Sequence, residues 1–378
     1  MKVVLVHDWL TGMRGGEKVL AELVRMFPSA DVYTLFWRRG SVAAGIEARI
    51  RGTSFLDRMF HAAHAYRYYL PLFPLAVRSL RLPPCDLVLS SSHAVAKGAR
   101  IPPGAVHVSY VHTPMRYVWD SADDYFRFGR GRRWRRVALS LIRPYLRWFD
   151  RRTAAGVDFF VANSENVRRR IQRIYGRDAC VVPPPVDTDF FTPEGAPAGE
   201  FYLVVSSLEP YKRVDLAVRA FSGGSRRLIV AGKGTLERDL RRLAAPPVEF
   251  AGEVSDTKLR QLYRRSRALV FPGREDFGIV PVEAQACGRP VICYGEGGAL
   301  ETVLDGETGI HFRPQTAEAL LDAVARLERH AWNPAAIRLH SLKFSRDQFR
   351  RRMIGVLEAA LAPAGGSPGA VRAAGCAP

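Results

Sequence analysis

The chain has 378 residues, more than one hydrophobic core usually supports, and this length predicts two domains. With 47% hydrophobic and 25% charged residues, the composition is that of a globular protein and excludes a disordered or fibrous one. The formal net charge of +19 belongs mostly to the first half, because residues 1–180 contain 30 Lys and Arg against 14 Asp and Glu, whereas residues 181–378 contain 26 against 23.

Short apolar runs alternate with longer amphipathic stretches along the chain. Strand-like runs occupy 2–7, 31–36, 86–91, 106–112 and 158–163, and after a proline-rich break at 181–187 they resume at 201–206, 227–232, 268–272 and 290–294. Near-continuous apolar strands separated by helical stretches are typical of parallel sheets covered on both faces. The pattern predicts an α/β protein with two doubly wound, Rossmann-like domains, at residues 1–180 and 181–345.

The C-terminal part is predicted to be a long helical stretch from about Pro334 to Leu361, whose end, residues 346–361, packs back towards the first domain. The tail at 362–378 is rich in Ala, Gly and Pro and is expected to be disordered. Ligands bind beyond the carboxyl ends of parallel strands. We therefore expect a site in the cleft between two facing domains, built from the loops that follow His7, His112, Ser207, Gly232, Pro272 and Tyr294.

Two glycine-containing turns follow predicted strands. In "TGMRGGEKVL", Gly15 and Gly16 precede a helix whose N-terminus suits an anion, although an ordinary strand-to-helix turn would also look like this. In "AGKGT", Gly232 lies in a turn that lacks the glycine spacing of a P-loop and suits packing against a nucleotide base. Neither turn defines a ligand by itself.

Charged residues follow two other predicted strands. In "SSLEPYKRVDLAV", Lys212 and Arg213 open a helix whose dipole they oppose, so they are either a phosphate site or a pair of solvated surface charges. In "EDFGIVPVE", Glu275 lies on the loop and Glu283 about one turn inside the next helix, because Pro281 is tolerated only in the first turn. The amides between them belong to Phe277, Gly278 and Ile279. Two acceptors around a helix N-terminus suit a ribose, a diphosphate and a hexose; the alternative is a capped helix with solvated glutamates.

The segment "EDFGIVPVEAQACGRPVICYGEGGALETVLDGETG" at 275–309 resembles the nucleotide-sugar site of the retaining GT-B glycosyltransferases of glycosyltransferase family 4. Seven further blocks match in order the subgroup associated with mannosyl transfer in bacterial surface-polysaccharide assembly, such as that of lipopolysaccharide. These are "HDWLTGMRGGEKVL", "SSSHAVAKG", "HTPMRYVWD", "VANSENVRRRI", "VVPPPVDTDFF", "LEPYKRVDLAV" and "GEVSDTKLRQLY". The resemblance covers nearly the whole chain and implies the GT-B fold.

The resemblance also implies a role for each candidate residue. Glu283 would bind the nucleotide ribose, and Glu275 would orient the donor hexose with the amides of Phe277 and Gly278. Lys212, with Arg213, would neutralise the leaving diphosphate. The remaining residues expected near the donor are Gly15, Gly16, Gly232, Ile279, Gly297, Gly298 and His112. His112 would lie beside the donor sugar as a catalytic residue with Glu275; the alternative is a capping or packing histidine.

One position departs from the family pattern. Ser207 stands where the family usually has an arginine that shares the diphosphate with the lysine. A charge-assisted phosphate contact is worth roughly 1.5–3 kcal/mol. Its loss implies weaker leaving-group stabilisation, compensation by Arg213 or Arg14, or a catalytically silent GT-B scaffold.

The chemistry implied by the resemblance is transfer of a hexose with retention of configuration, with GDP-mannose as the expected donor and another GDP- or UDP-hexose as the alternative. No obligatory cofactor is expected. The cysteines form no C-x-x-C pair and no D-x-D motif lies in a suitable loop, so we expect no metal site.

The basic segment "RFGRGRRWRRVALSLIRPYLRWFDRR" at 127–152 contains ten arginines interleaved with aromatic residues. It suits an anionic membrane surface, with Pro144 dividing it into two helices and a glycan or polyprenyl-diphosphate-linked acceptor reached from the cytoplasmic face. One alternative to membrane binding is that this segment is simply a solvated basic surface. A second alternative is nucleic-acid binding, but the sequence contains no nucleic-acid recognition motif beside the charge. With no apolar run of membrane-spanning length and no signal-peptide pattern, we expect a cytoplasmic protein, peripheral on the membrane.

Overall fold

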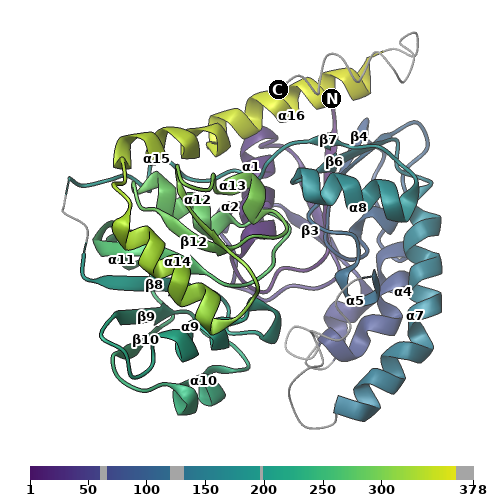
Figure 1. Cartoon of the computed structure of the whole chain (residues 1–378). Coiled ribbons are helices and arrows are strands. Elements are labelled where there is room, and N and C mark those ends of the chain that lie inside the picture. The colour runs from purple at the N-terminus through teal and green to yellow at the C-terminus, as the bar shows by residue number, and fades with distance from the viewer. Residues whose placement is uncertain (60–65, 120–131, 196–198, 363–378) are drawn as a thin grey trace. The chain divides into compact units, whose positions relative to one another are not determined.

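The computed structural model describes residues 1–59, 66–119, 132–195 and 199–362 (Figure 1). The chain forms two compact units, one of Met1–Pro185 together with the chain from Phe349 onward, and one of Val186–Gln348. Along the chain, the boundary between the units therefore lies between Pro185 and Val186, five residues after the boundary expected from the sequence. The expected tail, beyond residue 362, and residues 127–131 of the basic segment lie outside the described residues.

The first unit is built on a seven-stranded parallel sheet in the order β3-β2-β1-β4-β5-β6-β7. Its strands are β1 (Val3–His7), β2 (Asp31–Thr34), β3 (Ile50–Thr53), β4 (Leu87–Ser92), β5 (Val106–Val111), β6 (Phe159–Ala162) and β7 (Cys180–Val181). β1 and β4 are neighbours in register, with His7 opposite Ser91. The side chains that end these two strands are therefore adjacent.

The helices of this unit are α1 (Gly15–Met26), α2 (Ala44–Glu47), η1 (Phe55–Arg58), η2 (Tyr66–Leu72), α4 (Phe73–Arg78), η3 (Ala96–Gly98), α5 (Arg116–Trp119), α7 (Arg132–Ala154) and α8 (Glu165–Tyr175). The expected break at Pro144 is wrong, because α7 continues through it. The proline removes one helical hydrogen bond, and burial of the following Leu146 and Phe149 holds the second half of the helix against the unit.

The helical stretch expected at 334–361 consists of α15 (Pro334–Ser341), η5 (Leu342–Phe344) and α16 (Arg346–Leu361), and α16 has the bounds predicted for the C-terminal helix. Ser345 is extended, with φ −63° and ψ 161°, and its Oγ accepts a hydrogen bond from the amide of Gln348 at 3.3 Å. A serine that caps the first turn in this way starts a new helix.

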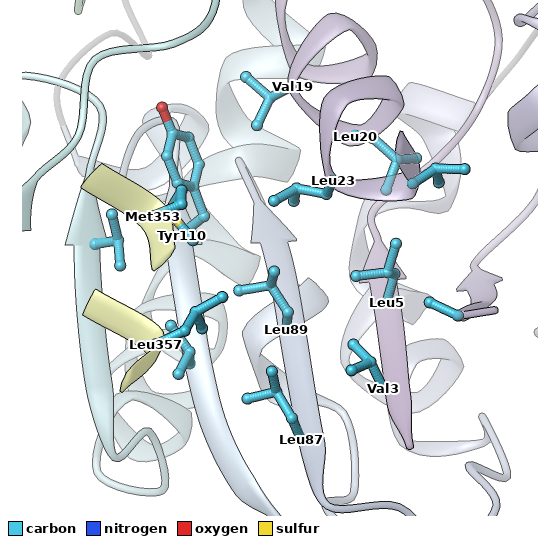
Figure 2. Packing of buried hydrophobic residues seen from close by; sticks show 14 of the residues in the cluster. Val3, Leu5, Val19, Leu20, Leu23, Leu87, Leu89, Tyr110, Met353 and Leu357 are labelled. Atoms are coloured by element: carbon cyan, nitrogen blue, oxygen red, sulfur yellow. The ribbon is translucent and has the colours of Figure 1, made fainter. Parts of the chain in front are cut away.

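Figure 2 shows the core on one face of the first sheet. Side chains of β1, β4 and β5 face α1 and the far part of α16; the labelled residues are Val3, Leu5, Leu87, Leu89, Tyr110, Val19, Leu20, Leu23, Met353 and Leu357. The hydroxyl of Tyr110 donates to the carbonyl oxygen of Val182 at 2.8 Å, which satisfies the one polar group among them. Residues 349–361 of α16 thus complete the core of the first unit.

The second unit is a six-stranded parallel sheet in the order β10-β9-β8-β11-β12-β13. Its strands are β8 (Phe201–Val205), β9 (Arg227–Ala231), β10 (Val248–Gly252), β11 (Ser266–Phe271), β12 (Val291–Tyr294) and β13 (Gly309–Phe312). Its other helices are η4 (Pro210–Lys212), α9 (Val214–Phe221), α10 (Glu237–Leu243), α11 (Asp256–Arg265), α12 (Ile279–Ala286), α13 (Ala299–Thr302) and α14 (Ala317–Arg329). Two parallel sheets flanked by helices confirm the predicted α/β class.

Candidate functional site

In the second unit, the loops after β8 and β11 bring Lys212 and Glu275 together. The Nζ of Lys212 donates to Oε1 of Glu275, and the two side chains are only 15% and 22% exposed. The contact requires close packing of the two loops, because a Cβ on Gly273 would lie 2.8 Å from the carbonyl oxygen of Lys212. Two residues that the sequence assigned to different parts of the donor are thus one ion pair.

Arg213 lies next to this pair in sequence but has its own partners. It has a left-handed backbone with φ 52°. Its guanidinium donates to Asp215 at 3.2 Å and to the side-chain oxygen of Gln315 at 3.1 Å. Gln315 in turn donates to the carbonyl oxygen of Pro272 at 2.8 Å. The arginine therefore ties the start of α9 to the end of β11, and the half-buried Ser207 adds no positive charge to the loop.

The glycines of this edge allow backbone segments to approach each other. A Cβ on Gly298 would lie 2.3 Å from the carbonyl oxygen of Asp276, and one on Gly297 would lie 2.4 Å from that of Glu275. The amide of Gly298 donates to the Glu275 carbonyl oxygen at 2.8 Å. Gly232, with φ 133°, allows a similar approach, because its Cβ would lie 1.9 Å from the Ser206 carbonyl oxygen. These positions require glycine whether or not a ligand is bound.

Glu283 lies inside α12 and is only 2% exposed. Its Oε2 accepts a hydrogen bond from the hydroxyl of Tyr263 at 3.0 Å, and burial together with this carboxylate raises the pKa of Tyr263. Pro281 is the third residue of α12, as the sequence predicted. The alternative of two solvated glutamates does not hold, because Glu283 is buried and Glu275 is paired.

The amides expected to face the donor sit at a well-fixed turn. Gly278 precedes α12 with φ 95°, a conformation that favours glycine. Phe277 is buried beside Phe344, with ring centroids 5.5 Å apart, and Ile279 packs against the same cluster. The turn is anchored on both sides by apolar packing.

In the first unit, the carboxyl ends of β1, β4 and β5 bring His7, Ser91 and His112 together. The Oγ of Ser91 lies 3.0 Å from Nδ1 of His7 and 2.8 Å from Nε2 of His112. Gly16, at the start of α1, lies against both rings, because its Cβ would be 3.4 Å from Cε1 of His7 and 3.6 Å from Nε2 of His112. The predicted residues Gly16 and His112 are therefore neighbours.

Asp8 fixes the loop that follows β4. Its fully buried carboxylate accepts four backbone hydrogen bonds of 2.6–2.9 Å, from the amides of residues 93–96. It also lies 3.2 Å from Nδ1 of His93. Burial lowers the pKa of His7 and of His93 to about 3, so both rings are neutral at neutral pH.

Sequence reasoning assigned no role to His7, Asp8, Ser91 or His93. All four lie in quoted blocks, "HDWLTG" and "SSSHAVAKG". Histidine and aspartate directly after an apolar strand were the available signal, because strand ends line ligand sites in parallel sheets.

The described part of α7 has an unusual outer face. Leu141, Tyr145 and Trp148, spaced along one side of the helix, are 76%, 40% and 61% exposed. Arg143 and Arg147 each donate to the carbonyl oxygen of Val118 at 2.8 Å and so face α5. Exposed apolar side chains thus lie on a helix whose other described face is fastened to the unit.

Two negative findings concern residues 1–59, 66–119, 132–195 and 199–362 only. Over these ranges, no helix has the length and apolar character needed to cross a membrane. The same ranges contain no cluster of three or more His, Cys, Asp or Glu side chains suited to hold a metal ion.

Two models of known protein families match the chain, one over most of each unit. Residues 13–190 match the model of Glycosyltransferase Family 4, and residues 187–338 match the model of Glycosyl transferases group 1. Together the two models cover residues 13–338, nearly all of the two units.

Curated relatives are glycosyltransferases as well. The chain is 31% identical over 244 residues to a D-inositol 3-phosphate glycosyltransferase of Acidothermus cellulolyticus, covering 55% of this chain and 54% of that one. It is 32% identical over 215 residues to a GDP-mannose-dependent alpha-(1-6)-phosphatidylinositol monomannoside mannosyltransferase of Mycobacterium tuberculosis, covering 49% and 56%. The chain thus spans about half the length of the curated relatives it matches.

Solved structures share the fold over nearly their full length. Anabaena HepE in complex with UDP and glucose has a TM-score of 0.69 at 17% identity, covering 94% of this chain and 99% of that one. Sucrose-phosphate synthase from Thermosynechococcus elongatus has a TM-score of 0.70 at 17% identity, covering 96% and 100%. The two matching domain models and this shared fold agree with each other, and the chain belongs to the glycosyltransferases of family 4 with the GT-B fold.

Proposed function

We propose that this protein is a retaining hexosyltransferase that moves mannose from GDP-mannose onto a glycan or lipid-linked acceptor in bacterial polysaccharide biosynthesis. The observation that carries the proposal is the half-buried Lys212–Glu275 pair in the loops after β8 and β11. A nucleotide-sugar donor consists of a diphosphate joined to a sugar, so the cation can bind the diphosphate while the adjacent carboxylate accepts hydrogen bonds from the sugar.

The proposed mechanism gives each partner of the pair a separate task once the donor binds. The ammonium group of Lys212 turns to the diphosphate and neutralises the charge that grows as the glycosidic bond breaks. The carboxylate of Glu275 accepts hydrogen bonds from the hexose hydroxyls, and Glu283 accepts those of the ribose. A diphosphate oxygen takes the proton of the attacking hydroxyl on the same face of the sugar, which retains its configuration. Positioning and electrostatic stabilisation supply the catalysis.

His112 is the proposed contribution of the first unit, beside the donor sugar and next to Gly16. Its ring is held by Ser91 and packs near His93, with ring centroids 6.2 Å apart. A histidine held among buried groups can keep one orientation through the reaction, which is what a positioned catalytic group requires.

The choice of donor rests on the relatives. The mycobacterial relative is named for its dependence on GDP-mannose, whereas HepE has been solved with UDP-glucose. Mannose from GDP-mannose is therefore the first candidate, and another GDP- or UDP-hexose is the second.

The donor is tested by thermal unfolding with GDP, UDP, GDP-mannose, UDP-glucose and a short oligonucleotide. A ligand at a hundred times its dissociation constant adds about 2.7 kcal/mol to the free energy of unfolding. We expect stabilisation by GDP and GDP-mannose that is lost in Lys212→Ala and kept in Lys258→Ala, whose lysine is exposed on α11 of the same unit. Stabilisation by the oligonucleotide alone would contradict the proposal. Binding without transfer of sugar to any lipid-linked acceptor would indicate a silent scaffold.

We also propose that the protein binds an anionic membrane surface through the outer face of α7. Exposed Leu141, Tyr145 and Trp148 would enter the interface, and the exposed Arg152, one turn after Trp148, would stay near the lipid phosphates. Each such cation adds about 1 kcal/mol of attraction. A lipid-linked acceptor would then meet the protein at the surface where it resides.

Vesicle sedimentation tests this second proposal. We expect binding to phosphatidylcholine vesicles that contain phosphatidylglycerol, weaker binding at high salt, and a blue shift of Trp148 fluorescence. Leu141→Ser should weaken binding, whereas Leu339→Ser, which removes a leucine that is 68% exposed on the second unit, should not. Equal binding by both variants would mean that α7 is a solvated face.

A further inference from the structure

Three side chains from neighbouring strands form a hydrogen-bonded chain in the first unit. Nδ1 of His7, on β1, lies 3.0 Å from Oγ of Ser91, on β4, and that oxygen lies 2.8 Å from Nε2 of His112, directly after β5. We propose that His7 and Ser91 are positioning residues that fix the ring orientation and the tautomer of His112. The inference rests on the proposed function, in which His112 lies beside the donor sugar.

His7 acts through Ser91 and does not itself touch a ligand. Both residues are 0% exposed, and they face each other in the register of β1 and β4. The His7 ring is also enclosed by Gly16, whose Cβ would lie 3.4 Å from its Cε1, and by His93, with ring centroids 5.7 Å apart. A ring enclosed in this way has little freedom to turn, so it gives Ser91 a fixed partner.

The direction of the chain follows from the protons available. Burial lowers the pKa of His7 to about 3, so its ring is neutral and carries a single N–H. Nε2 of His7 is buried and has no hydrogen-bond partner among the described residues. The proton can be on Nδ1, where it is donated to Ser91, or on Nε2, where it would be a buried donor without an acceptor. Because a buried N–H without an acceptor is the rarer and costlier case, the proton belongs on Nδ1.

This assignment fixes the state of His112. If Nδ1 of His7 donates to Oγ of Ser91, the hydroxyl proton of Ser91 is free to be donated to Nε2 of His112. His112 then carries its own proton on Nδ1. If Nε2 of His112 donated instead, Oγ of Ser91 would accept from both rings, and the buried hydroxyl proton of Ser91 would have no acceptor among the described residues. The chain therefore favours a neutral His112 whose proton is on Nδ1.

The same strand provides a matched control. Ser90, the residue before Ser91, lies 2.9 Å from Nε2 of His107, and both residues are buried. Ser90→Ala removes one buried serine–histidine hydrogen bond from β4, and Ser91→Ala removes two. Both variants should therefore lose stability, Ser91→Ala somewhat more, and only Ser91→Ala should affect His112.

The test uses the full-length protein labelled with ¹⁵N at histidine. In the wild type, NMR should show His112 as the Nδ1–H tautomer. Ser91→Ala should change the tautomer balance of His112, whereas Ser90→Ala should change only His107. With GDP-mannose and a lipid-linked acceptor, Ser91→Ala should lower kcat on the order of tenfold, the size of one neutral hydrogen bond, and leave the donor KM unchanged. Substitution of His7 by Asn, which keeps a polar atom near the position of Nδ1, should retain more turnover than His7→Gln.

Two results would overturn the proposal. One is an Nε2–H tautomer of His112 in the wild type, or a tautomer that Ser91→Ala leaves unchanged. The other is an equal loss of kcat in Ser90→Ala and Ser91→Ala, which would mean that lost stability alone explains the effect. If the wild type transfers no sugar from any nucleotide sugar, the proposed function fails, and the NMR comparison still decides whether the chain sets the tautomer.

Discussion

The two units place different kinds of groups at the carboxyl ends of their strands. In the first unit these are buried or partly buried polar side chains that bind one another across strands, as His7, Ser91 and His112 do. In the second unit they are backbone segments in close approach, made possible by glycines, beside the ion pair of Lys212 and Glu275. One edge owes its shape to buried hydrogen bonds and the other to the absence of side chains.

Each unit also contains an ion pair whose exposure can be compared with that of a pair in the other unit. In the first unit, Lys97 and Asp150 form an ion pair with exposed fractions of 2% and 0%, and Asp150 also accepts hydrogen bonds from Trp119 at 2.7 Å and Tyr175 at 2.8 Å. In the second unit, Lys233 pairs with a glutamate on the surface, with exposed fractions of 63% and 76%. The first unit therefore contains an ion pair whose two charges are buried, although most described cations of this unit are not part of such a pair.

The largest predicted effect comes from breaking this buried pair. Asp150→Ala would leave the ammonium group of Lys97 buried without a carboxylate, which should lower the free energy of unfolding by about 3–5 kcal/mol. Glu253→Ala removes the acid of the exposed pair and should cost less than about 1 kcal/mol. Urea unfolding of both variants measures the difference. Equal losses would show that burial of the first pair has no energetic consequence.

The residues that shape one of these edges are easier to recognise in the sequence than those that shape the other. Gly297 and Gly298 of "YGEGG" make close backbone approaches to the loop after β11 and are visible as a residue type. The hydrogen bond between His7 and Ser91 joins residues 84 positions apart. This hydrogen bond depends on which strands are adjacent in the sheet, and the residue types do not indicate that order. Hydrogen bonds between side chains of different strands were therefore not predicted, even where the residues lie in the quoted sequence blocks.

The fold shows the same limit. The interior strands of both sheets were predicted, because their apolar runs are continuous, whereas the four edge strands β3, β7, β10 and β13 were missed. β3, at Ile50–Thr53, was missed, since it contains an exposed arginine and a glycine. β7 was missed because its two residues, Cys180 and Val181, lie at the edge of the sheet. The basic segment was expected to divide at Pro144, but packing of the helix outweighed the loss of one hydrogen bond.

The next effect tests the close backbone approach in the second unit. Gly298→Ala would place a Cβ 2.3 Å from the carbonyl oxygen of Asp276 and 2.4 Å from Cα of Phe277, so backbone must move. Such overpacking typically costs about 1–3 kcal/mol, and the displaced loop should also bind nucleotide sugar more weakly. Gly224→Ala is the control, because its Cβ would meet nothing closer than 3.5 Å.

Gly16→Ala extends this test to the first unit. Its Cβ would meet only the side chains of His7 and His112, at 3.4 Å and beyond. We expect its cost in thermal unfolding to lie between those of Gly298→Ala and Gly224→Ala. A larger cost for Gly16→Ala than for Gly298→Ala would mean that the two edges are not built as differently as their contacts indicate.

For a single residue and one pH unit, the smallest predicted effect concerns acid. Burial lowers the pKa of His7 and His93 to about 3 and of His107 to about 4. Below pH 6.5 the unfolded chain binds these protons and the folded unit does not, so stability falls as pH falls from 6.5 towards 4, by up to about 1.4 kcal/mol per pH unit for each histidine. Glu17 acts in the opposite direction, because burial raises its pKa to about 7, and it contributes stability that is lost as pH rises from 4.5 to 7. Three histidines outweigh one glutamate, so the net change on acidification is a loss.

A single substitution isolates the contribution of one buried histidine to this pH dependence. His107→Gln removes a histidine that is 1% exposed and lies away from His112 in the hydrogen-bond network. Whatever its effect at neutral pH, it should reduce the dependence of the unfolding free energy on pH by about 1 kcal/mol per unit between pH 6 and pH 5. His330→Gln, at an exposed position of the second unit, should leave that dependence unchanged. If both variants follow the wild-type curve, the acid sensitivity does not come from the buried imidazoles of the first unit. The comparison between the two units would then rest only on the geometry of the groups at the ends of their strands.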